Sequence, residues 1–332
     1  MQTTPSNLAF FYTALETRFW TAYTAAAEWH EQVCNIFPVG TEQWVSGWMD
    51  ILPKFRLWQG PRKTQAPALE TYLVPIDPYE LTVGVDMFKI MDDKYQLYYP
   101  ISSQMGLQGR KLWDYQLRDL LQNTGIQTGS RQNGTDGNAN FYTLHPVNVY
   151  DASFGTYSND YRGTFTSNGV VCGGPLTSAN AFATLWQDMS ARPSPNGEAL
   201  GLNPDRLMHA PMLRQTANTV LQAQFIGAPQ LGYLGSGSGA AGTMVGATEN
   251  MVRGWATAMN VPDLSAQPTT WYLTCEHGGL KPFSILLREA PNFVARLSPT
   301  DPIVFEQHQY AFGSWARGNP AWSLPFLSSI SS

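Results

Sequence analysis

Two alternating segments separated by a proline-rich stretch constrain the architecture of this 332-residue chain more than any other feature. Residues 54–58 (KFRLW) and 81–88 (LTVGVDMF) alternate apolar and polar positions, which is the period of a β-strand. The stretch between them, residues 59–80, holds four prolines and no long apolar run. A long hairpin with so little core of its own is marginally stable in isolation. The sequence therefore predicts an extended two-stranded loop that lies on another surface.

The charges of this loop are segregated. Its first side is basic and its second side is acidic, the residues being Arg56, Arg62 and Lys63, then Glu70, Asp77, Glu80 and Asp86. Such a division favours contact with a surface of complementary charge.

The strongest helix prediction covers residues 100–124, where Pro100 suits the first turn and Gly125 the position after the last. Its apolar stripe consists of Ile101, Met105, Leu112, Leu117, Leu120 and Leu121. Weaker patterns predict helices over 7–33, over 177–191 and from Pro211, and strands over 140–146, 206–210, 271–275 and 303–318. Helices and strands that follow no βαβ alternation indicate an α+β fold.

The surface is expected to be poor in charge. Charged residues make up 14% of the chain, against about 25% in an average protein. Aromatic residues make up 13% and include 11 tryptophans. Because interface cores are depleted in charge and enriched in aromatics, the composition favours a chain that contacts much other protein. A large core under a neutral polar surface is the alternative that composition leaves open.

Charge and hydropathy argue against several classes of protein. The net charge of −5 disfavours nucleic-acid binding through a basic surface. The chain has no apolar run long enough to span a membrane, and its start does not resemble a secretory signal. The three cysteines, Cys34, Cys172 and Cys275, are too few and too scattered for a disulfide framework or a zinc site. Synthesis in a reducing cytoplasm fits best.

A glycine-rich stretch raises the possibility of a nucleotide cofactor. Residues Gly237 to Gly242 satisfy G-x-G-x-x-G, and Asp263 follows about twenty positions later. The pattern should follow a strand and open a helix, but here a short segment with a proline and a glycine precedes it. We interpret it as a chance match, with a Rossmann-like nucleotide-dependent enzyme as the open alternative.

Other chemical motifs are weaker. His30 and Cys34 are four residues apart on a predicted helix, but no third metal ligand is evident. The chain has no G-x-S-x-G element, and none of its five histidines has a recognisable catalytic context. We therefore predict no catalytic residue, metal or cofactor, and no enzyme activity. A glycan-binding role for exposed aromatics stays open as a second alternative.

The order of several short motifs resembles that of phage major capsid proteins with the HK-97-like fold, and more closely the major head subunit (gpT) family of Mu-like phages and prophages. The resemblance covers residues 8 to 318. In the first half of the chain the motifs lie at the start of the extended loop, before the long helix and after it: Trp58, Gly60 and Arg62; Met91, Asp92, Asp93, Tyr98 and Pro100; Asp136, Gly137, Phe141, Tyr142, His145 and Pro146. In the second half they lie in an Asn-Pro segment and in the closing strands: Asn203, Pro204, Asp205, Leu207, Pro211, Leu213 and Ala217; Trp271, Tyr272 and Leu273; Asp301, Pro302, Val304, Phe305, Gly313, Ala316, Arg317 and Gly318. Residues 64–80 and 147–175 depart from the family pattern.

The resemblance implies an α+β architecture in five parts. These are an N-terminal arm (1–45), the extended loop with its strands (46–92), a peripheral domain with a spine helix near 100–124 (93–199), an axial domain (200–295) and C-terminal strands (296–332). The extended loop is expected to lie on a neighbouring subunit. The expected contacts between subunits are Arg56, Trp58, Arg62, Lys63, Glu70, Asp77 and Glu80.

The resemblance also implies a structural role. The chain is expected to form homo-pentamers and homo-hexamers of an icosahedral head that encloses double-stranded phage DNA without sequence-specific binding. It is expected in the virion after assembly in the bacterial cytoplasm, with a portal and, in some heads, a decoration protein. Because the loop motif begins near residue 50, no leading scaffold segment is expected, and a separate scaffolding protein is implied.

Overall fold

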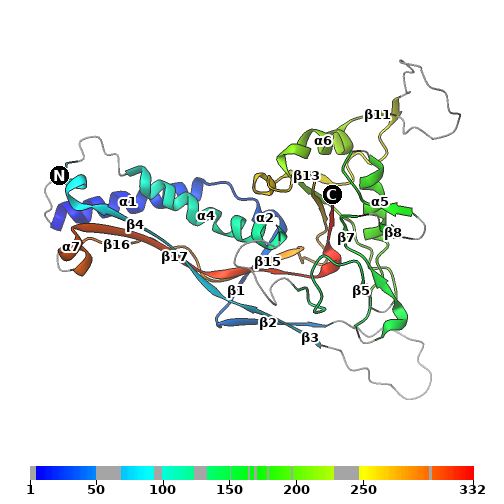
Figure 1. Ribbon diagram of the computed structural model, residues 1–332, viewed down its shortest axis with the longest axis horizontal. Coiled ribbons are helices and arrows are strands. Elements are labelled where there is room, and N and C mark those ends of the chain that lie inside the picture. The colour runs from blue at the N-terminus through cyan, green and yellow to red at the C-terminus, as the bar shows by residue number, and fades with distance from the viewer. Residues whose placement is uncertain are drawn as a thin grey trace. The chain divides into compact units, whose positions relative to one another are not determined.

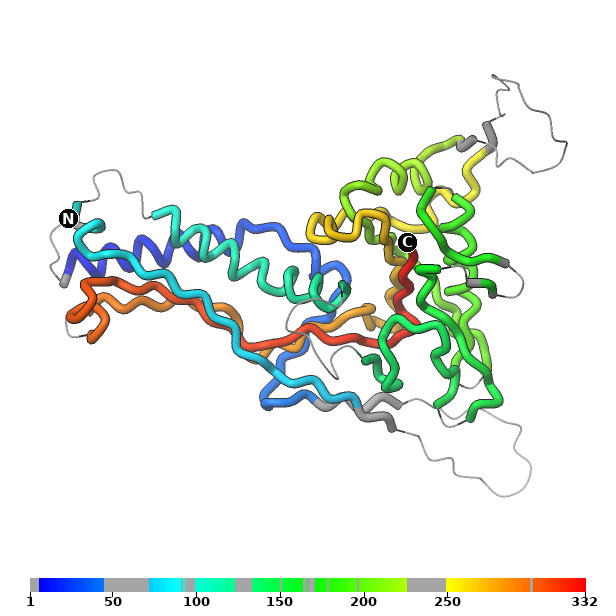
Figure 2. The backbone as a smooth tube through the Cα atoms, viewed as in Figure 1, coloured from blue at the N-terminus to red at the C-terminus, as the bar shows by residue number. Residues whose placement is uncertain are grey.

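The computed structural model describes residues 5–49, 69–92, 99–122, 133–149, 151–163, 165–167, 170–177, 179–195, 197–227, 247–298 and 301–332. The chain divides into two compact units (Figures 1 and 2). Unit 1 comprises Met1–Ser46, Thr71–Gln132 and Phe283–Trp322, and unit 2 comprises Gly47–Glu70, Asn133–Pro282 and Ser323–Ser332. Residues 133–199, predicted as part of a peripheral domain, thus belong to the same unit as 200–282.

Unit 1 is built on a long strand, β17 (Gln309–Trp322). Its five-stranded sheet has the order β1-β15-β17-β16, with β4 also paired to β17. These partners are β1 (Cys34–Pro38), β4 (Asp77–Asp86), β15 (Phe283–Glu289) and β16 (Val294–Arg296). All pairs are antiparallel except β1 with β15. A separate ribbon pairs β2 (Gln43–Met49) with β3 (Leu69–Pro75).

Two long helices of unit 1, α1 (Pro5–Ala25) and α4 (Tyr99–Gln122), lie side by side along the sheet (Figure 1). Short helices complete the unit, namely α2 (His30–Val33), α3 (Met87–Met91) and α7 (Pro302–Gln307). The buried face of α1 carries Leu8, Phe11, Leu15 and Phe19, spaced three or four residues apart. Full burial of each such side chain stabilises the fold by about 1.5–3 kcal/mol.

Two glycines allow α4 to pack closely. A Cβ atom on Gly106 would lie 2.2 Å from the carbonyl oxygen of Phe19, so this position sets the approach of α1. A Cβ atom on Gly318 of β17 would lie 2.6 Å from the Trp113 ring. Any larger residue at either position would push α4 away from its neighbour.

Unit 2 has its own mixed sheet, with strand order β13-β10-β14-β18-β7. The strands are β7 (Asp160–Tyr161), β10 (Arg206–His209), β13 (Thr257–Asn260), β14 (Trp271–Thr274) and β18 (Ser328–Ser331). Helices α5 (Ala179–Ser190) and α6 (Arg214–Gln222) share a core with this sheet, in which Phe182, Trp271 and Leu273 are fully buried. Three small hairpins complete the unit, pairing β5 (His145–Pro146) with β6 (Thr156–Tyr157), β8 (Phe165–Ser167) with β9 (Val170–Cys172), and β11 (Phe225–Gly227) with β12 (Ala247–Glu249).

A buried arginine fastens the end of the chain within unit 2. Arg192 donates to the carbonyl oxygens of Phe326 at 2.8 Å and Ser158 at 3.0 Å, and it also bonds the Ser329 hydroxyl. Because a buried cation is costly unless its donors are satisfied, these bonds specify where β18 enters the sheet.

Several predicted elements are confirmed. The helix expected over 100–124 is α4, that over 177–191 is α5, and the strands over 206–210 and 271–275 are β10 and β14. The helix from Pro211 begins as a 3₁₀ turn, Pro211–Leu213, before α6.

Four predicted boundaries are wrong. The helix expected over 7–33 breaks after Ala25, where the chain turns into α2. The strand expected over 303–318 begins only at Gln309, because Asp301 caps α7 and His308 reverses the chain at a φ of 50°. Strand β4 begins at Asp77 and ends at Asp86, whose carboxylate caps α3. Of residues 140–146, only His145 and Pro146 form a strand.

Replacing Gly106 by alanine should lower the free energy of unfolding by about 1–3 kcal/mol, because the added methyl group would overlap the Phe19 carbonyl. Gly109→Ala is the matched control on the same helix, since its nearest contact would be an ordinary 3.5 Å to Pro291. The control should be neutral or stabilising by up to about 1 kcal/mol through helix propensity. Urea unfolding followed by circular dichroism measures both. Equal effects of the two substitutions would contradict the packing argument.

Candidate intersubunit surface

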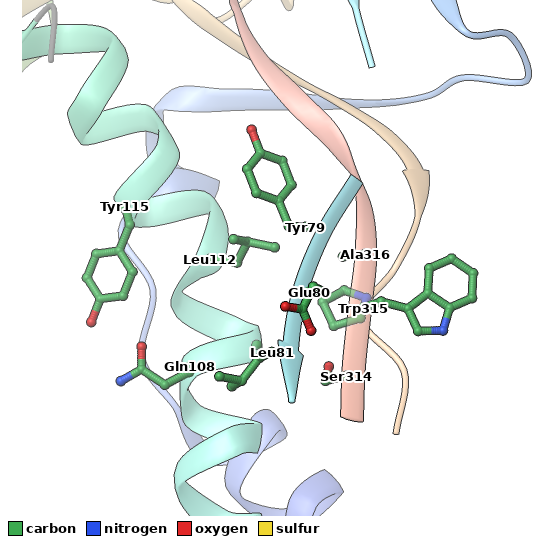
Figure 3. Close-up of a pocket in the computed structure, with 11 residues that line it drawn as sticks. Tyr79, Glu80, Leu81, Gln108, Leu112, Tyr115, Ser314, Trp315 and Ala316 are labelled. Carbon is green, nitrogen blue, oxygen red and sulfur yellow. The ribbon is translucent and has the colours of Figure 1, made fainter. Parts of the chain in front are cut away.

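A groove runs between α4 and the strands β4 and β17 of unit 1 (Figure 3). Its volume is about 290 Å³. Its walls consist of Tyr79, Glu80 and Leu81 from β4, Gln108, Gly109, Leu112 and Tyr115 from α4, Ser314, Trp315 and Ala316 from β17, and Pro291. The lining is largely apolar, which suits the side chains of another protein segment.

The two strands bring their groove residues together through a continuous antiparallel register, from Asp77 opposite Gly318 to Asp86 opposite Gln309. Since strand residues alternate between faces, Tyr79 and Leu81 share a side of β4. Leu81 and Leu112 lie in the space between strand and helix, whereas the ring of Trp315 points away from α4 (Figure 3).

A partly buried polar network links β4 and β17 to α4 at the groove. The Tyr79 hydroxyl lies 2.6 Å from Asn319 Oδ1 and 3.0 Å from Gln116 Oε1. Asn319 in turn donates from Nδ2 to the Pro75 carbonyl oxygen at 2.6 Å. The Trp113 ring packs edge-on against Tyr79. These contacts fix the positions of β4, β17 and α4, and so the shape of the groove between them.

The groove combines exposed apolar surface with one carboxylate. Leu81 and Trp315 are 36% and 40% exposed, values that are high for such large side chains. Glu80 is the one carboxylate among the described lining residues, and its Oε2 accepts a hydrogen bond from Thr82 Oγ1 at 2.6 Å. The arrangement suits an apolar or aromatic segment that carries a cation.

The structure describes three of the seven predicted contact residues. Glu70 lies on β3, and Asp77 and Glu80 lie on β4. Asp77 is half-buried and Glu80 is exposed at the groove. Their spacing of three places them on opposite faces of the strand, so they form no single acidic face. Arg56, Trp58, Arg62 and Lys63 lie outside the described residues.

Sequence analysis missed the groove residues other than Glu80 as contact candidates. Gln108, Leu112 and Tyr115 recur at spacings of four and three, which marks one helical face. That signal was available. The position of Trp315 opposite Glu80 was not, since it depends on strand pairing between distant parts of the chain.

The histidine and cysteine motifs that the sequence singled out lie in surroundings that serve packing and hydrogen bonding. His30 hydrogen-bonds Asp114, while Cys34 is a buried thiol that forms no disulfide. Burial raises the pKa of the Cys275 thiol to about 11, which disfavours the reactive thiolate. In the described parts of the chain, no group of three or more His, Cys, Asp or Glu side chains can hold a metal ion. Gly237–Gly242 lies outside the described residues.

Comparison with known proteins identifies the family. The family model described as "Mu-like prophage major head subunit gpT" matches residues 8–171 and 249–332, about three quarters of the chain. The chain belongs to this family. The major capsid protein of Escherichia phage Mu is 25% identical over 147 residues, which are 44% of this chain and 47% of that protein. The match thus spans about half the length of the Mu relative.

Solved capsid structures share the fold. The chain in the procapsid of bacteriophage JBD30 is similar with a TM-score of 0.54 and 20% identity, over 99% of this chain and 76% of that one. The chain in the JBD30 capsid decorated with minor capsid protein trimers gives 0.52 and 18%, over 72% and 91%. The predicted α+β, HK-97-like fold is confirmed.

The family is a structural one and not a class of enzymes. The findings give no support to a nucleotide-dependent enzyme or to a glycan-binding protein. No helix among the described residues is both long and apolar enough to cross a membrane.

Removing the buried amide of Asn319 should lower the free energy of unfolding, because this amide links the groove strands. Asn319→Ala leaves the Pro75 carbonyl without its donor, and we expect a loss of about 1–3 kcal/mol in unfolding free energy. Gln108→Ala, on the exposed wall of the same groove, should stay within about 0.5 kcal/mol. Thermal unfolding at fixed pH compares the two variants, and a neutral Asn319→Ala would show that the network is dispensable.

Proposed function

We propose that this chain is the major capsid subunit of a tailed-phage head, which assembles with copies of itself into a closed icosahedral shell. The observation that carries the proposal is the match of the gpT major head subunit family along most of the chain. The fold shared with the JBD30 procapsid supports it. In this proposal the protein acts in the virion, and its chemistry is association without catalysis.

The surface of unit 1 suits a subunit whose neighbours cover it. Phe10 on α1 and Phe305 on α7 are 72% and 76% exposed. Single exposed apolar residues are ordinary, but Leu81 and Leu112 meet in the groove, and the same strands expose Trp315 on the side away from α4. With only 14% of residues charged, the chain has few groups to solvate such a surface as a monomer.

We further propose that the extended loop of one subunit contacts the groove of the next subunit in a pentamer or hexamer. The sequence of residues 54–63 combines Phe55, Leu57 and Trp58 with four cations, Lys54, Arg56, Arg62 and Lys63. The groove offers the complementary set, namely apolar walls and, at its edge, the Glu80 carboxylate. Charge complementarity sets register and partner choice more than affinity. In this arrangement Glu80 is a direct intersubunit contact.

The remaining partners follow from the same proposal. A separate scaffolding protein directs assembly, a portal replaces one pentamer, and the shell encloses phage DNA without sequence-specific contacts, in keeping with the net charge of −5. One JBD30 capsid carries minor capsid protein trimers, and a comparable decoration protein would have to bind the outside of this shell. We place the assembly in the bacterial cytoplasm.

Sedimentation of the purified full-length chain, alone and with its scaffolding protein, tests the proposal. We expect fast-sedimenting material that negative-stain microscopy resolves as closed shells, tubes, or five- and six-membered rings. Particles no larger than a dimer in both preparations would overturn it.

Exchanging the charges of the loop and of Glu80 tests the loop-to-groove contact separately from the ability to assemble. Glu80→Lys alone should abolish shells by placing like charges together, and so should the triple change Arg56→Glu, Arg62→Glu and Lys63→Glu. Combining all four in one chain should restore shells, measured as the sedimenting fraction. Glu306→Gln, on α7 and outside the groove, serves as the control. Failure of the combined variant to assemble, when the control assembles, would refute the loop-to-groove contact.

A further inference from the structure

The turn between α1 and α2 is fastened to the spine helix α4 by buried charges. Helix α2 has no capping side chain of its own. Asp114 of α4 takes that place, since its Oδ1 accepts hydrogen bonds from the backbone N–H groups of Trp29 at 3.2 Å and His30 at 3.0 Å. Unpaired N–H groups at a helix start need such an acceptor. The carboxylate of Asp114 therefore fixes the start of α2 against α4.

His30 lies between two carboxyl groups. Its Nδ1 is 2.7 Å from Asp114 Oδ1, and its Nε2 is 3.4 Å from Glu28 Oε2. The side chains of His30 and Asp114 are almost completely buried. A neutral imidazole has one N–H and one lone pair. The imidazole can therefore hydrogen-bond both carboxyl groups at once in only two ways: either the ring is protonated and donates to both, or Glu28 carries the proton and donates to Nε2.

The charges of this cluster balance when it holds one proton. Arg110 of α4 forms an ion pair with Glu28, and its guanidinium lies 5.3 Å from the centre of the Tyr23 ring of α1. Glu28 and Asp114 contribute two negative charges and Arg110 one positive charge, so one added proton gives neutrality. Glu31 also reaches Arg110, at 3.3 Å, but it is 55% exposed and water screens its charge.

We propose that the cluster of Glu28, His30, Arg110 and Asp114 is a proton-dependent latch, in which one proton shared by Glu28 and His30 holds the turn between α1 and α2 against α4. Loss of that proton leaves an uncompensated buried negative charge, which favours release of the turn. The latch belongs to the single chain, so its test does not depend on assembly.

The direction of the pH effect follows from proton counts. Burial, reinforced by the hydrogen bond and charge of Glu31 and by the charge of Asp114, raises the pKa of Glu28 to about 8, although Arg110 opposes this. In an opened turn, glutamate and histidine have their ordinary pKa values of about 4.3 and 6.5. Between about pH 7 and pH 8 the closed turn therefore keeps one proton that the open turn has lost. Stability of the closed turn is present below this window and falls as the pH rises through it.

Hydrogen exchange of the full-length chain measures this opening. Mass spectrometry of peptides that cover residues 26–33, from pH 6.5 to 8.5 and corrected for intrinsic exchange rates, gives the opening constant. Release of one proton raises that constant by up to about tenfold per pH unit. We expect this rise in the native chain between pH 7 and pH 8.

Two isosteric variants distinguish the latch from a general pH effect. Glu28→Gln removes the titrating carboxyl and should remove the pH dependence, whereas Glu31→Gln should retain it with the midpoint moved to lower pH, because Glu31 helps to raise the pKa of Glu28. An unchanged pH dependence in Glu28→Gln, or no pH dependence in the native chain, would overturn the proposal. Should Glu28→Gln not fold, carbon-13 NMR of labelled glutamate carboxyls and histidine rings decides. A glutamate carboxyl that titrates near pH 8 in the native chain supports the latch, and the absence of any such carboxyl overturns it.

Discussion

Close packing of α4 against its two neighbours is the constraint on which unit 1 depends. Gly106 lets the helix touch the backbone of α1, and Gly318 lets Trp113 lie against β17. Because interiors are packed as densely as organic crystals, these contacts leave little freedom in the position of α4. The groove wall, the Tyr79 network and the charge cluster at Asp114 all contain α4 side chains, so each inherits its geometry from this packing.

Different faces of one helix have different roles as a result. Toward its middle, α4 supplies Arg110 and Asp114 to hold the turn after α1. On another face, Leu112 and Tyr115 border the groove that we propose as an intersubunit contact. A shell subunit needs a rigid body that presents surfaces at fixed angles and an arm whose attachment is adjustable. Apolar packing supplies the first, since it is insensitive to pH, and a buried ionisable cluster supplies the second.

The chain belongs to the gpT major head subunit family, in which a subunit packs against copies of itself. The proposed loop contact is apolar with a single carboxylate at its edge. Association of this kind takes its energy from buried area and its selectivity from charge. Such contacts suit a lattice in which one surface must fit many slightly different neighbours.

The sequence by itself determined the local elements and the class of fold. The apolar stripe of α4 and the alternation in β4 predicted both, because helix and strand periods are properties of neighbouring residues. It also supplied the family motifs and the charge pattern of the loop. Only the tertiary structure placed Trp315 opposite Glu80 and Asp114 beneath the start of α2, since these pairs are separated by 235 and 84 or more positions. It also decided where α2 begins, because the acceptor for the N–H groups of Trp29 and His30 comes from α4 and not from the local sequence.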